Sequence, residues 1–179
     1  MRNRDELDEF HEHAVRLFHN YLAAAKSLVD HTRIFVKEIY NGTGFGKEYD
    51  VEVRKCFRES DLGSFVQDLR NFFLHRQIPL TSATLKWETG KKIKNSIMLD
   101  VKELLTWDKW SRHAKAYLSK FNSEIDLLTL IDGYTSLVMK FYEWLEEKQF
   151  EIHQEVFDEL RKLDERRQIL INELDQKIK

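Results

Sequence analysis

The stretch Arg70-Asn71-Phe72-Phe73-Leu74-His75 brings a guanidinium, an amide and an imidazole together within six residues. A neutral imidazole can act as a general base near neutral pH, and a guanidinium can stabilise charge on phosphate oxygens. Such groups suit the cleavage of a phosphodiester bond, and this chemistry needs no metal ion or other cofactor. Arg70, Asn71 and His75 are therefore the candidate catalytic residues.

The helix expected around this stretch determines which way its side chains face. Successive residues of an α-helix turn by about 100°, and we place Leu69 at the centre of the buried face. Four other apolar residues then fall within about 60° of Leu69: Leu62, Phe65, Phe72 and Phe73. The three candidate catalytic residues face away from this core, and Leu74 lies among them. A symmetric dimer packed on this face would cover Leu74 and bring two copies of the polar residues together.

The spacing Arg70-Asn71-x-x-x-His75 resembles the signature of the HEPN superfamily, the higher eukaryote and prokaryote nucleotide-binding proteins. In that signature an Arg, commonly followed by a polar residue such as Asn, precedes a His. The resemblance implies a small helical bundle that pairs its motif across a homodimer. Many members are metal-independent endoribonucleases of defence, toxin–antitoxin and RNA-processing systems.

Carried onto this chain, the resemblance gives Arg70 and His75 catalytic roles and Asn71 a supporting one. The implied reaction is attack by the ribose 2′-hydroxyl of RNA on the adjacent phosphate. An antitoxin or a nucleotidyltransferase is the partner protein that such systems would supply. The alternative is a non-catalytic helical module of the same fold, which dimerises or binds another protein through the same face.

Each motif residue also has an ordinary structural role that the sequence leaves open. Arg70 could pair with a surface acid, and His75 near a helix C-terminus could interact with the helix dipole. Asn71 could simply be solvated. Arg4 and His11 fit the looser form of the motif as well, and we interpret them as a chance match at the start of the first predicted helix.

Helical periodicity through most of the chain predicts an all-α bundle with long first and last helices. The first helix is expected from about Arg4 to Tyr40, where a glycine-rich loop over 41–46 stops it. Its apolar stripe recurs every seven residues at Leu7, Ala14, Tyr21, Leu28 and Phe35. A short helix is expected over about 50–58, and Ser60 or Asp61 caps the motif helix.

The last helix is expected to be the longest, with its N-terminal cap at Asn122 or Ser123. Its apolar stripe runs without interruption to the end of the chain. The stripe consists of Leu127, Ile131, Tyr134, Val138, Phe141, Leu145, Ile152, Val156, Leu160, Leu163, Leu170, Leu174 and Ile178. Because no repeat or linker is visible, residues 1–179 are interpreted as a single HEPN-like helical bundle domain.

Over about residues 83–100 the pattern changes from helix to strand and predicts one small β-hairpin insertion, with a turn at Thr89-Gly90. The hairpin carries Trp87 and four lysines: Lys86, Lys91, Lys92 and Lys94. An aromatic ring can stack on a base and lysines can hold a phosphate backbone, so these five residues are candidate RNA contacts. The lysines could equally protect an exposed strand edge from aggregation.

The composition excludes several other classes of protein. The 29 basic and 31 acidic residues leave a net charge of −2, which does not suit a protein that coats nucleic acid. The single cysteine, Cys56, excludes an intramolecular disulfide. With no export signal and no long apolar span, a cytoplasmic protein without a membrane segment is expected.

Two further candidate sites are rejected from the sequence. The cluster His11-Glu12-His13 lacks the paired Glu-x-x-His spacing of a dimetal bundle, so no metal site is expected. Cys56 has no nearby His and lies on no recognisable nucleophile turn. The aromatic series Trp107, Trp110, Tyr117 and Phe121 recurs at helical spacing and is assigned to the core.

Overall fold

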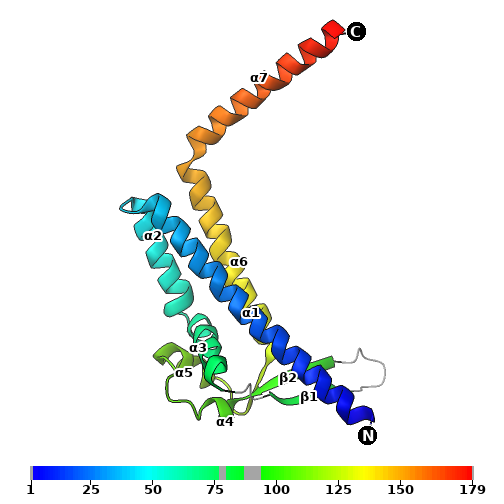
Figure 1. Cartoon of the computed structure of the whole chain (residues 1–179). Coiled ribbons are helices and arrows are strands. Elements are labelled where there is room, and N and C mark those ends of the chain that lie inside the picture. The colour runs from blue at the N-terminus through cyan, green and yellow to red at the C-terminus, as the bar shows by residue number, and fades with distance from the viewer. Residues whose placement is uncertain (1, 77–79, 87–93, 179) are drawn as a thin grey trace. The chain divides into compact units, whose positions relative to one another are not determined.

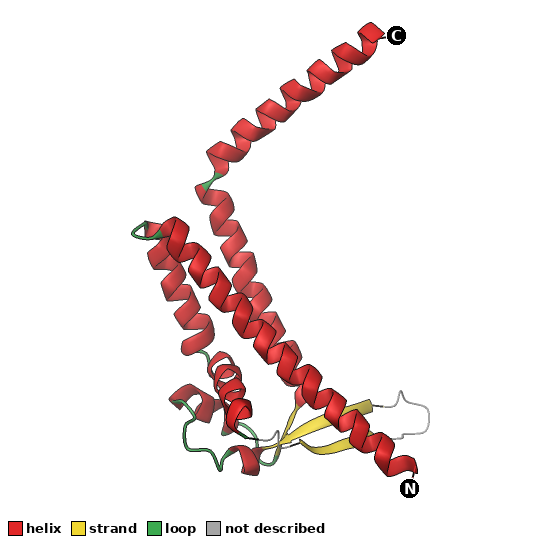
Figure 2. Ribbon diagram, in the orientation of Figure 1, coloured by secondary structure: helices red, strands yellow, loops and turns green. Residues whose placement is uncertain are grey.

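The computed structural model describes residues 2–76, 80–86 and 94–178, of which 2–8, 11, 80–86, 94–96, 177 and 178 are described by their backbone alone. The elements in chain order are α1 (Arg2–Tyr40), α2 (Gly44–Val53), the π-helical turn η1 (Arg54–Arg58), α3 (Asp61–His75), β1 (Leu80–Lys86), β2 (Lys94–Asp100), α4 (Val101–Leu104), α5 (Arg112–Leu118), β3 (Glu124–Asp126), α6 (Leu127–Ile152) and α7 (Gln154–Ile178). Figures 1 and 2 show these predominantly helical elements. The predicted helical fold with long first and last helices and a small hairpin is confirmed.

The chain divides into two compact units, residues 1–141 and 142–179, which are described separately. The first unit contains α1 to β3 and the N-terminal part of α6, and the second contains the remainder of α6 and all of α7. Within the described parts of both units, no helix has the length and apolarity that crossing a membrane requires.

Helix α1 has the predicted length but buries a different face from the predicted one. The residues that it contributes to the core are Phe18, Leu22, Val29, Val36 and Tyr40. Leu28 and Phe35, from the predicted stripe, are 46% and 43% exposed. The helix carries two apolar stripes about 100° apart, since Phe35 and Val36 are adjacent in sequence. The periodicity of the sequence shows both apolar stripes of α1. Which of the two is buried depends on the packing of α1 against α2 and α3.

The glycine-rich segment ends one helix and begins the next. Gly42 has a φ of 78°, a conformation that favours glycine, and it lies two residues after Tyr40, the last residue of α1. The Thr43 hydroxyl then accepts a hydrogen bond from the Gly46 amide at 3.1 Å and caps α2. The prediction of a helix starting near residue 50 was therefore wrong at its N-terminus, because the Thr43 cap outweighs the cost of two glycines in the first turn.

The strands form a three-stranded antiparallel sheet in the order β1-β2-β3. The predicted hairpin is present, and it begins at Leu80, slightly before the expected position. Strand β3 was not predicted; it pairs Ile125 with Leu99, and both side chains are buried. The predicted helix cap at Asn122 or Ser123 was wrong, because Asp126 accepts the Thr129 amide at 2.8 Å and α6 begins only at Leu127.

The predicted last helix is two helices, α6 and α7, with His153 between them. No proline or glycine marks this interruption, so the sequence carries no signal for it. The rings of Phe150 and Phe157 stack across it with centroids 4.8 Å apart. In the first unit, α6 buries Leu127, Leu130, Tyr134, Val138 and Phe141. The prediction of one continuous helix was wrong at His153, and the apolar residues that α7 contributes to the predicted stripe are exposed.

Candidate active site

Helix α3 presents the motif on the side opposite to its buried face. Its core stripe includes Leu69 and Phe72, which are 0% and 1% exposed. Asn71, Leu74 and His75 are exposed, and Arg70 is half-buried. The outward orientation that helical geometry predicts for this stretch is therefore present, with Leu74 53% exposed among the polar groups.

Polar contacts determine where α3 begins. The Ser60 hydroxyl accepts the Gly63 amide at 3.2 Å and caps the helix, as predicted. A Cβ at Gly63 would overlap the backbone carbonyl oxygen of Cys56, so glycine allows this turn to lie close to η1. The Ser64 hydroxyl also donates to the Arg58 carbonyl at 2.7 Å. These contacts fix the position of the first turn of α3. Because an α-helix is regular, they also fix where the motif lies further along it.

Aromatic packing holds the end of α3 that carries the motif. Phe72 stacks on Trp110 and meets Trp107 edge-on, with ring centroids 5.7 and 5.6 Å away. The Trp110 indole donates to the Leu104 carbonyl at 2.8 Å. From the other side, Phe18 of α1 meets Phe73 edge-on at 5.5 Å. The two tryptophans are buried as expected, and they fix the backbone from which the outward residues project.

A second cation that the sequence reasoning missed lies beside His75. The Arg76 guanidinium donates to the Thr106 hydroxyl at 2.9 Å, and its amide donates to the Phe72 carbonyl. Arg76 is exposed, so it adds positive charge at the same end of α3. Its position directly after the motif was the available signal.

The motif side chains have no polar partner within the described parts of the chain. No side-chain hydrogen bond or ion pair links Arg70, Asn71 or His75 to another described residue. The structural role in which Arg70 pairs with a surface acid is therefore not observed among those residues.

A separate charged cluster joins the first turn of α3 to α5. Asp61 contacts the His113 ring nitrogen at 3.1 Å and the Lys120 ammonium at 2.7 Å. The hydrogen bond from Lys120, and then that from His113, lowers the pKa of Asp61. Asp61 precedes Arg70 by nine residues, or about 14 Å along the helix. The cluster therefore positions α3 and contributes no group to the motif face.

The hairpin candidates can be placed only in part. Lys86 and Lys94 are register partners at the ends of β1 and β2. Trp87, Lys91 and Lys92 lie outside the described residues.

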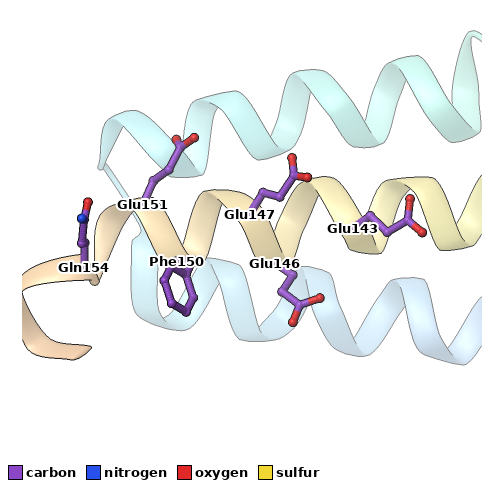
Figure 3. A pocket seen from close by; sticks show the side chains of 6 residues that line it. All are labelled: Glu143, Glu146, Glu147, Phe150, Glu151 and Gln154. Carbon is purple, nitrogen blue, oxygen red and sulfur yellow. The ribbon is translucent and has the colours of Figure 1, made fainter. Parts of the chain in front are cut away.

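An acidic hollow of about 510 Å³ lies in the second unit, lined by Glu143, Glu146, Glu147, Phe150, Glu151 and Gln154. Figure 3 shows Glu147 and Glu151 on one side of α6 and Glu146 and Phe150 on another. Carboxylates repel phosphate groups, so this hollow does not suit RNA. Within the described residues, no group of three or more His, Cys, Asp or Glu could hold a metal ion.

A basic hollow of about 400 Å³ lies where α1 meets α2 and includes Arg33, Lys37 and Lys47 in its lining. No residue of the motif lines it. Arg33 is already paired with Asp30 at 3.3 Å, and Asp50 adds a negative charge to the lining. The hollow therefore supplies no group to the chemistry of α3.

Cys56 does not form a nucleophilic site. Burial, followed by a hydrogen bond to Glu52, raises the pKa of the Cys56 thiol to about 11. The sulfur lies 3.4 Å from the Glu52 carboxylate. The thiol is therefore protonated at neutral pH, whereas a nucleophile requires the thiolate.

Comparison of the chain with known protein families, curated proteins and solved structures gave no match. The resemblance to HEPN proteins therefore rests on Arg70, Asn71 and His75 and on their helical setting.

Proposed function

We propose that this protein is a HEPN-like, metal-independent endoribonuclease that acts as a homodimer, with Arg70 and His75 as catalytic residues and Asn71 in support. The observation that carries the proposal is the exposed face of α3. There, three polar groups without a partner among the described residues surround an exposed leucine. A defence or toxin role in the cytoplasm is part of the proposal, with an antitoxin or a nucleotidyltransferase as the controlling partner.

The dimer brings two motifs together. Leu74 is 53% exposed, and covering a leucine to this extent stabilises an interface by about 1 kcal/mol for each copy. Arg70 and Leu74 are neighbours on the helix surface because they are four residues apart. A twofold axis beside Leu74 would therefore bring two copies of Arg70 and His75 into one cleft.

The chemistry follows from these groups. The neutral imidazole of His75 accepts the proton of a ribose 2′-hydroxyl, whose oxygen then attacks the adjacent phosphorus. The Arg70 guanidinium stabilises the additional negative charge on the phosphate oxygens, and the Asn71 amide donates a hydrogen bond to them. The 5′-oxygen leaves with a proton from an imidazolium, so the products are a 2′,3′-cyclic phosphate and a 5′-hydroxyl. Arg76 and the lysine pair at Lys86 and Lys94 would attract the RNA.

The test is cleavage of labelled RNA by the purified protein in EDTA. Wild-type protein should release fragments ending in a cyclic phosphate, and His75→Ala should abolish cleavage, since the general base is lost. Arg70→Ala should slow cleavage by about 100-fold or more. His31→Ala, at an exposed histidine of α1, is the matched control and should retain full activity. Intact RNA with wild-type protein across many substrates would contradict the proposal, as would undiminished cleavage by His75→Ala.

The second candidate function is a non-catalytic helical interaction module. The observation that favours it is the long apolar surface of α7, which takes no part in the chemistry of α3. This function predicts that Leu74→Glu disturbs assembly while His75→Ala changes neither stability nor partner binding.

A further inference from the structure

We propose that α7 binds the α7 of a second copy of this chain as an antiparallel two-helix coiled coil. The inference concerns the second unit and does not rest on the proposed ribonuclease activity. It is argued from the exposure, the spacing and the charges of α7.

Apolar side chains of α7 are exposed along the whole helix. Among its described side chains, from Gln154 to Gln176, Asp158 is half-buried and the others are exposed. The large apolar residues are 40–59% exposed: Val156, Phe157, Leu160, Leu163, Ile169, Leu170, Ile171 and Leu174. A helix that buries no face gains little stability in water. A surface of this kind therefore indicates a binding partner.

The spacing of these residues is that of a coiled-coil seam. Val156, Leu160, Leu163, Arg167, Leu170 and Leu174 alternate in steps of four and three residues, the repeat of the a and d positions in heptads. The helix has 25 residues, which is more than three heptads. Its partner should therefore be another helix lying along the seam.

The seam is complementary to itself when the second copy runs in the opposite direction. With a twofold axis at Glu165, seam residues equally far from position 165 in the two copies lie opposite each other. Three kinds of layer result: Val156 against Leu174, Leu160 against Leu170, and Leu163 against Arg167. Phe157 and Ile171 each directly follow a seam residue and so lie on the same flank, where an antiparallel pair brings Phe157 of one copy next to Ile171 of the other. Self-complementary surfaces of this kind form symmetric dimers.

The charges at the centre of α7 favour the antiparallel direction. Arg167 pairs with Asp164 of its own helix at 2.8 Å. In the antiparallel pair the Asp164 residues of the two copies face each other on one flank of the seam, and the two Arg167 residues lie beside them, so two positive charges balance two negative ones. In a parallel pair Arg167 would lie against its own copy, and Glu159 would face Asp164 across the interface.

The opposite flank of the antiparallel pair carries like charges. There Glu159 would face Glu173 of the second copy, and Arg166 would face its own copy. These side chains are exposed, and exposed charges at this separation interact weakly and are screened by salt. The apolar layers therefore decide the association, and moderate salt should strengthen it.

Disulfide trapping tests the partner and the direction together. In the full-length Cys56→Ser chain, Leu160→Cys and Leu170→Cys are made separately and mixed under mild oxidation. The antiparallel pair predicts a disulfide between the two different variants and none within either variant alone. Disulfides within each variant would indicate a parallel pair. Trapping in no mixture would indicate a monomer or docking of α7 elsewhere, and either result would overturn the proposal.

The molar mass in solution gives an independent test. Leu74→Glu is used as the background, so that any pairing through α3 is removed. This chain should sediment as a dimer, and adding Leu163→Glu should halve its mass. Adding Ile169→Glu instead should leave the dimer intact, since Ile169 is 57% exposed but lies off the seam. A Leu74→Glu chain that remains monomeric at high concentration, or equal effects of the two glutamates, would contradict the coiled coil.

Discussion

Helices α6 and α7 carry the same apolar period and differ in what covers it. In the first unit, Leu130 and Phe141 of α6 are each 1% exposed, whereas Leu160 and Leu163 of α7 are 54% and 59% exposed. The helix α6 packs against α1, where the Tyr21 hydroxyl donates to the Ile131 carbonyl at 3.2 Å. The difference shows that an apolar stripe marks a surface able to bind, and that the neighbouring elements determine whether it becomes core or interface.

The same contrast applies to the two faces of α3. Its inner face meets tryptophans from the α4–α5 segment and Phe18 of α1. Its outer face, with Leu74 and the motif, has no such neighbour among the described residues. The outer face of α3 and the apolar surface of α7 are therefore candidates for assembly, one next to the proposed chemistry and the other remote from it in sequence.

Truncating one leucine in α6 and one in α7 should give the largest difference in unfolding free energy between the two helices. Leu130→Ala should destabilise the first unit by about 2–5 kcal/mol, because it removes methyl groups from a packed core and leaves a cavity. Leu160→Ala should change the same transition by less than about 0.5 kcal/mol. Urea unfolding followed by tryptophan fluorescence measures both, since Trp107 and Trp110 are buried in the first unit. Equal losses for the two variants would mean that α7 belongs to that core.

Local geometry explains what the sequence could predict. The exposed and buried faces of α3 follow from one helical periodicity with Leu69 at the centre of the buried face, so the sequence alone predicts that Leu74 and His75 lie on the outer face. The Ser60 cap and the hairpin follow from equally local signals. By contrast, α1 has two apolar stripes, and no local rule indicates that Val36, and not Phe35, is buried.

Long-range contacts explain what the sequence could not predict. Strand β3 is three residues long and exists because Ile125 pairs with Leu99. The Asp61 cluster joins residues that are 52 and 59 positions apart. The interruption at His153 has no proline or glycine to mark it. The proposed catalytic roles of Arg70, Asn71 and His75 stay predictions, because they depend on a second copy and on RNA.

Substitutions at the start of α6 and at the start of α7 should differ by a smaller amount in their effect on the stability of the first unit. Asp126→Ala should destabilise the first unit by about 1 kcal/mol, since the Asp126 carboxylate caps α6 by accepting the Thr129 amide at 2.8 Å. Glu155→Ala, in the first turn of α7, should leave that transition unchanged. Urea unfolding of the two variants side by side provides the measurement. Loss of stability in Glu155→Ala but not in Asp126→Ala would contradict the view that α6, and not α7, belongs to the core of the first unit.

The smallest effect expected is a pH dependence confined to the first unit. Lys120, and then His113, lowers the pKa of Asp61 below its ordinary value of 3.8, so the folded state favours the carboxylate. The resulting stabilisation is present above about pH 4 and is lost as the pH falls through the pKa of the folded state. The difference in unfolding free energy between wild type and Asp61→Asn should therefore shrink between about pH 5 and pH 3. Other carboxylates titrate in both proteins and largely cancel in this difference.

The matched control for this titration lies in α7. Asp164 pairs with Arg167 within one helix, and both side chains are 68% exposed, so Asp164→Asn should leave the unfolding of the first unit unchanged at every pH. Asp61 differs because its two partners, His113 and Lys120, lie outside α3. The ionised Asp61 carboxylate therefore links parts of the chain that are far apart in sequence. A constant difference between wild type and Asp61→Asn from pH 5 to pH 3 would show that the carboxylate does not hold α3 against α5. The position of the motif would then depend on the Ser60 and Ser64 hydrogen bonds at the start of α3 and on the aromatic contacts of Phe72 and Phe73.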